Sequence, residues 1–137
     1  MKIRRIVCLV IIGLVLVAAA SCSSSKLDED SAKMMRTALT LTSGVEITGL
    51  EMDKKTLEIS YTQTGQPTLA ANLQRWLDMS AVAISFMEEP RTIVIRPSVA
   101  DEPVAEVTVR SEEIASWLNG NISLEQALAS IQVEELE

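Results

Sequence analysis

Residues 56–62 read Thr-Leu-Glu-Ile-Ser-Tyr-Thr, which is the clearest strand pattern in the chain. Its second, fourth and sixth residues are apolar and the others polar, which is the pattern of a strand with one buried and one solvated face. Residues 45–52 alternate in the same way except at Gly49, where the change of phase indicates a bulge. Residues 53–55 form a turn between the two runs, so the sequence predicts a β-hairpin over residues 45–62.

A long helix and a second pair of strands are predicted after this hairpin. Residues 68–87 carry apolar side chains at spacings of three and four, which is typical of a helix that covers a core. Residues 92–96 contain three consecutive apolar residues and predict a central strand, and residues 104–109 alternate again. Two hairpins joined by a long helix predict an α+β fold: a two-layer sandwich with a four-stranded sheet.

Further helices are predicted on both sides of this unit. Residues 28–42 begin with acidic residues and place their apolar residues on one side, as a helix would. Ser111 is expected to cap a short helix that ends at Leu118. Ser123 and Gln126 have the spacing of a capping box at the start of a last helix.

The composition excludes several kinds of chemistry. The chain has 137 residues and no histidine, so it has no histidine-dependent nucleophile system and no histidine-ligated metal. Its two cysteines, Cys8 and Cys22, both lie near the N-terminus, which leaves the rest of the chain without a disulfide or a thiolate metal site. Phosphate-binding and hydrolase motifs are also absent. We therefore expect no cofactor and no metal.

The first residues have the pattern of an export signal. Residues 1–5 carry three positive charges, residues 6–20 carry none, and small residues follow. At about 1.5 Å per residue, a helix of this uncharged run would span about 22 Å. A bilayer core is about 30 Å thick, so the run is short for a transmembrane helix. The N-terminus is therefore interpreted as a secretory signal peptide.

The end of this segment, Val17-Ala18-Ala19-Ala20-Ser21-Cys22, resembles the lipobox of bacterial-type lipoproteins. The resemblance implies cleavage between Ser21 and Cys22 and acylation of the Cys22 sulfur, as by palmitate. It divides the chain into a signal peptide (1–21), a lipidated cysteine with a serine-rich tether (22–27) and a single α+β domain (28–137). It also implies a location on the cell membrane or the outer membrane, facing away from the cytoplasm. The alternatives are a secreted protein cut near Ala20 and an uncleaved anchor.

The mature chain would be strongly acidic. Removing residues 1–21 removes three of the twelve basic residues and none of the nineteen acidic ones, which leaves a formal charge of −10. Such a chain is repelled by anionic lipid and by nucleic acid, so we expect no nucleic-acid partner and assign membrane binding to the lipid on Cys22. Residues 134–137 are expected to be a solvated acidic end.

Neighbouring carboxylates are the remaining candidates for a site. Glu88 and Glu89 follow the long helix, where acids oppose the helix dipole, and we interpret them as a contact for an envelope protein partner. A carboxylate-based hydrolase that uses Glu88, Glu89 or Asp101 is a minor alternative.

The sequence thus favours a lipid-anchored extracytoplasmic module without catalysis of its own, acting through protein contacts or as an accessory to an envelope complex. The second hypothesis is a module that binds a small solute or peptide on the sheet face away from the long helix. On the first two strands, this face would carry Glu46, Thr48, Thr56, Glu58, Ser60 and Thr62.

Overall fold

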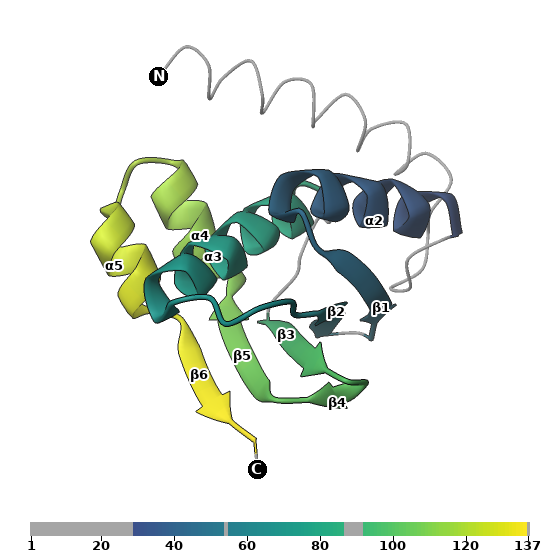
Figure 1. Ribbon diagram of the computed structural model, residues 1–137. Coiled ribbons are helices and arrows are strands. Elements are labelled where there is room, and N and C mark those ends of the chain that lie inside the picture. Colours follow the sequence, from purple (N-terminus) through teal and green to yellow (C-terminus); the bar gives the residue numbers. More distant parts are fainter. Residues whose placement is uncertain (1–28, 54, 87–91, 137) are drawn as a thin grey trace.

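The computed structural model describes residues 29–53, 55–86 and 92–136 (Figure 1). The elements, in chain order, are α2 (Glu29–Ser43), β1 (Glu46–Met52), β2 (Thr56–Thr62), α3 (Leu69–Ser85), β3 (Thr92–Val99), β4 (Glu102–Pro103), β5 (Ala105–Arg110), α4 (Ser111–Leu118), α5 (Leu124–Ala129) and β6 (Gln132–Glu135).

The strands form one mixed sheet in the order β1-β2-β3-β5-β6, and β4 pairs with β3 outside this path. β2 and β3 are parallel, with Thr56 opposite Thr92, and the other pairs are antiparallel. β2 and β3 are parallel because α3 returns the chain to the end of the sheet at which β2 began, so that both strands run in the same direction. The α+β class is confirmed. The predicted four-stranded sheet is wrong, because the sheet has six strands.

One of the two additional strands is β4, and the other is formed by the C-terminal acidic segment. Residues Gln132–Glu135 pair with β5 as strand β6, although the sequence predicted only a solvated acidic end. All four residues are exposed, so the strand has no buried face. β6 is held by backbone hydrogen bonds to β5. Because these bonds do not require a buried side chain on every second residue, the sequence of β6 lacks the hydrophobic alternation by which a strand is predicted.

The first hairpin forms as the sequence predicted. The pairing of β1 with β2 shifts register between Ile47 and Gly49, which confirms the bulge. The Asp53 carboxylate accepts hydrogen bonds from the backbone N–H groups of Lys55 and Thr56, each at 2.9 Å. These two bonds close the turn between the strands and hold the pKa of Asp53 below its usual value.

The N-terminal caps of the helices agree in part with the caps that the sequence predicts. The Thr68 hydroxyl accepts a hydrogen bond from the Ala71 N–H and caps α3. The capping box of Ser123 and Gln126 is confirmed at the start of α5. The predicted cap of α4 is wrong: Arg110 is the N-cap residue and Ser111 is the first residue of the helix. The extended strand β5 runs directly into α4, so no loop residue is left to provide a side-chain cap.

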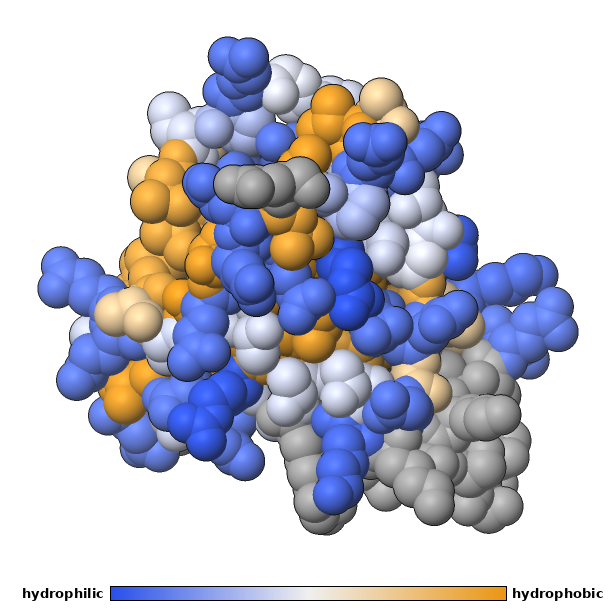
Figure 2. Space-filling model, turned by 90° about the horizontal axis from the view of Figure 1, so that it is seen from below, coloured by the Kyte–Doolittle hydropathy of each residue, from blue (hydrophilic) through white to orange (hydrophobic). Residues whose placement is uncertain are grey.

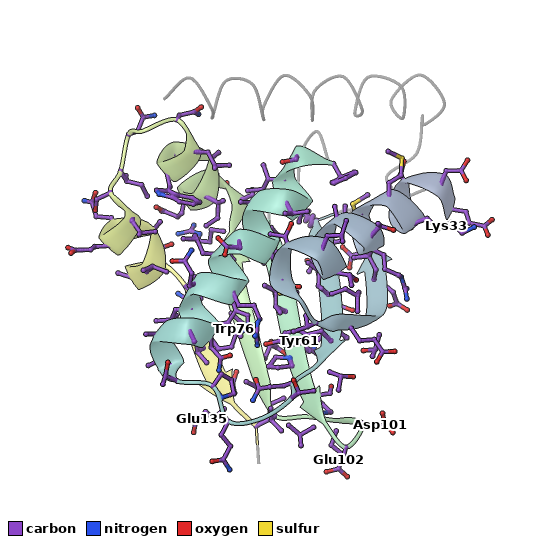
Figure 3. All side chains as sticks on the ribbon, turned by 45° about the horizontal axis from the view of Figure 1, so that its top comes forward. Lys33, Tyr61, Trp76, Asp101, Glu102 and Glu135 are labelled. Carbon is purple, nitrogen blue, oxygen red and sulfur yellow. The ribbon has the colours of Figure 1, made fainter. Side chains whose placement is uncertain are left out.

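The helices lie over one face of the sheet (Figures 1 and 3). The apolar residues of β2, β3 and β5 that face them are fully buried: Leu57, Ile59, Tyr61, Ile93, Ile95, Val107 and Val109. They pack with buried side chains of the helices: Met35, Leu39, Trp76, Leu77, Met79, Ala83, Ile114 and Ala127. The core therefore lies between the two layers, and the opposite face of the sheet has no helix over it among the described residues.

Candidate functional site: the open face of the sheet

Most of the site residues that the sequence suggested lie outside the described part of the structure. Ser21, Cys22, Glu88 and Glu89 are all in segments that the structure does not describe. Asp101 is described, and it lies exposed in the turn between β3 and β4, where its backbone has a positive φ of 65° (Figure 3). A general acid or base is usually a carboxyl group in a more buried setting, which Asp101 does not have.

The strand registers define a second set of residues, which all point to the side of the sheet opposite the helices. We call this surface the open face. Its residues are Glu46, Gly49, Glu51, Thr56, Glu58, Ser60, Thr62, Thr92, Val94, Arg96, Ser98, Glu106, Thr108, Arg110, Gln132 and Glu134. Apart from Gly49 and Val94 they are all polar. The view from below in Figure 2 shows hydrophilic side chains around and between apolar ones.

An arginine in the central strand connects three strands of the open face. Arg96 on β3 contacts Glu58 on β2 at 3.1 Å and Glu106 on β5 at 3.3 Å. About a third of each of these side chains is exposed. Partial burial lowers the pKa of Arg96, but the hydrogen bonds and charges of Glu58 and Glu106 outweigh this and raise the pKa overall. The guanidinium charge is therefore fixed and is shared between two carboxylates.

Each of these two glutamates lies directly opposite a second glutamate. Glu51 on β1 is opposite Glu58, and Glu134 on β6 is opposite Glu106. Like charges in directly opposed positions destabilise a sheet. Arg96 compensates one member of each pair, while Glu51 and Glu134 form no ion pair with any residue that the structure describes. The open face thus holds more negative charge than its own arginines neutralise.

The sequence predicted one side of this surface and missed the other. Glu46, Thr56, Glu58, Ser60 and Thr62 lie on the open face as expected. Thr48 is skipped by the register at the bulge. Arg96, Glu106 and Glu134 were missed, because their placement depends on which strands are neighbours. The alternation of residues 104–109 was the only sequence signal that pointed Glu106 away from the core.

The buried face contains one polar contact of a different kind. The Trp76 indole Nε1–H donates a hydrogen bond of 2.9 Å to the Tyr61 hydroxyl, and both side chains are buried (Figure 3). Burial raises the pKa of Tyr61, and the hydrogen bonds from Trp76 and Arg75 oppose this rise only in part. One turn earlier on α3, the side-chain oxygen of Asn72 is buried without a hydrogen-bond partner. The Tyr61–Trp76 contact joins β2 to α3 and acts on stability.

The described residues provide neither a metal centre nor a membrane span. No group of three or more carboxylate, thiol or imidazole side chains in this part of the chain could hold a metal ion. None of its helices combines the length and the apolar character needed to cross a bilayer. Comparisons of the chain with protein-family models, with curated proteins and with solved structures found no match.

Proposed function

We propose that the protein is a lipid-anchored extracytoplasmic module that acts through protein contacts and has no catalytic activity of its own. The observation that supports this most directly is the open face. Sheets made only of parallel strands are covered on both faces, and among the described residues the parallel β2–β3 pair of this mixed sheet has helices on one face only. A partner protein that covers the second face would complete a common arrangement.

The arrangement of charges also supports contact rather than catalysis. The open-face carboxylates are partly or fully exposed, and the two nearest Arg96 are ion-paired. Exposed, paired carboxylates serve electrostatic complementarity between protein surfaces better than proton transfer. The same features argue against the hydrolase alternative.

The anchor limits where such contacts take place. Seven residue steps separate Cys22 from Glu29, the first residue of α2, and a chain of that length reaches at most about 25 Å. A lipid at Cys22 would keep the domain close to the bilayer, with each buried CH₂ group of the acyl chains contributing about 0.8 kcal/mol. The partner would then be another component of the same membrane surface.

The anchor is tested by the intact mass of the protein purified from membranes. The wild type should lack residues 1–21 and carry acyl groups, and Cys22→Ala should lack the acyl mass. Cys8→Ala is the matched control, because Cys8 lies in the segment that is removed. Lipidation at Cys22 is contradicted if the wild type and Cys22→Ala differ in mass only by the sulfur atom that the substitution removes.

The contact is tested by photo-crosslinking in intact membranes. A photoreactive residue at Thr108, on the open face, should give one recurrent protein adduct. The same residue at Thr37, exposed on α2, is the control and should not give this adduct. The proposal fails if positions on the open face give no adduct, or if both positions give the same set of adducts.

A further inference from the structure

We infer that the open face binds a surface of a partner protein that is rich in lysine and arginine. This inference rests on the proposed function, because it names the chemistry of the partner that would cover the face. Its first support is charge. The face carries five glutamates and two arginines, and both ion pairs of Arg96 are made within the face itself.

The two opposed glutamate pairs lower the stability of the sheet through charge repulsion, and the fold does not need glutamate at these exposed positions. Glu51 opposite Glu58 and Glu134 opposite Glu106 bring like charges together on neighbouring strands. Neither Glu51 nor Glu134 contacts the core, and both are exposed. A basic side chain placed beside either pair would relieve this repulsion, and an acidic or neutral one would not.

The spacing of the charges fits a protein surface better than a single ion. Neighbouring strands are about 4.8 Å apart, so Glu51 on β1 and Glu134 on β6 lie about 19 Å apart in the direction perpendicular to the strands. No group of three or more acids on the described residues could hold a metal ion. Basic side chains distributed over a partner surface of that width would reach both glutamate pairs at once.

Other occupants agree less well with the charge. A second copy of this chain would bring the same acidic face and be repelled, as would nucleic acid or an anionic membrane surface. The residues around Arg96 include Ser60, Thr62, Ser98 and Thr108, which are short and neutral. They would allow a partner backbone to approach without displacing larger side chains.

The test uses the processed full-length protein in a zwitterionic detergent, with an oligolysine peptide of about ten residues as the probe. Binding is measured at about 0.02 M salt, where the Debye length is roughly 20 Å. Amide chemical shifts should change on the strands of the open face, β1, β2, β3, β5 and β6, and remain unchanged on α4 and α5. The double variant Glu51→Gln with Glu134→Gln should bind about fivefold more weakly, since it removes two exposed charge contacts.

The matched control is Glu112→Gln with Glu125→Gln, which makes the same change of net charge on exposed positions of α4 and α5. It should bind oligolysine within about twofold of the wild type, since these charges are remote from the face. Equal weakening by both double variants, shift changes spread over the helices, or no binding would each overturn the inference.

The two proposals can fail separately. Specific binding of oligolysine without any adduct from open-face positions in membranes would contradict the proposed function. It would still support the inference that the open face binds basic side chains. An adduct at Thr108 without oligolysine binding would keep the proposed function and overturn the basic character of its partner.

Discussion

Replacing Tyr61 by phenylalanine should destabilise the protein, mainly through loss of the buried hydrogen bond from Trp76. The ring of phenylalanine fills the same space, so packing is preserved. The Trp76 Nε1–H, which donates to the Tyr61 hydroxyl at 2.9 Å, would remain buried without an acceptor. Leaving a buried donor unpaired costs about 1–3 kcal/mol. With an unfolding entropy of about 2.1 cal/mol/K per residue, 1 kcal/mol corresponds in this domain to a change in Tm of about 4 °C, so the variant should melt about 4–13 °C lower.

The assays are thermal unfolding, which gives Tm, and urea unfolding, which gives the free energy of unfolding, both followed by far-ultraviolet circular dichroism. Ser80→Ala is the matched control. Its hydroxyl donates to the Trp76 carbonyl at 2.7 Å, and that carbonyl lies within α3 and is a backbone acceptor of the helix. Removing this second buried hydroxyl should therefore cost less than about 1 kcal/mol, because it leaves no buried donor without a partner.

A double-mutant cycle isolates the contact. Trp76→Phe removes the indole donor, so Tyr61→Phe should cost about 1 kcal/mol less in the Trp76→Phe background than in the wild type. The reasoning is refuted if the two substitutions are additive, or if Tyr61→Phe is no more destabilising than Ser80→Ala.

Three further results are expected. Tyr61 is the only tyrosine, and burial raises its pKa, so the folded protein should form tyrosinate only above the usual value of about 10. The stability of the protein should hold below that pH and fall as the pH rises beyond it. An ultraviolet titration of folded and urea-unfolded protein measures this difference in pKa. Arg96→Met removes two partly exposed ion pairs worth about 0.2–1 kcal/mol each. The resulting decrease in the free energy of unfolding should be smaller in about 1 M salt, because salt screens exposed charges. A decrease that salt does not change would contradict the partial exposure of these ion pairs. Ser123→Ala should cost about 1 kcal/mol in urea unfolding, whereas Ser111→Ala should cost almost nothing because Arg110 is the N-cap; equal costs would contradict the observed caps.

The parts of the fold that the sequence predicted are those in which neighbouring residues act together. The alternation in residues 56–62 and the bulge at Gly49 are both properties of a few consecutive residues, and both are present. The first helix was predicted over residues 28–42 and is observed over Glu29–Ser43. Strand β6 was missed because an exposed edge strand needs only a neighbour to pair with, and its own residues need not alternate.

The candidate site depended on information that the sequence does not contain. Arg96 is a polar residue at the end of an apolar run, with nothing local to indicate a partner. It lies between Glu58 and Glu106 because β3 pairs in parallel with β2 and antiparallel with β5. The opposition of Glu106 and Glu134 likewise follows from the pairing of β5 with β6. Strand order, which no local pattern encodes, therefore creates the open face.

The parallel pairing of β2 with β3 also has a consequence for the order in which the protein folds. Opposed residues of this pair, such as Thr56 and Thr92, are 36 positions apart in the chain, whereas Met52 and Leu57 in the first hairpin are 5 apart. Closing the longer loop costs more entropy, so the two antiparallel halves should form early and dock late. The rate-limiting step would then be the docking of the two halves, which α3 connects.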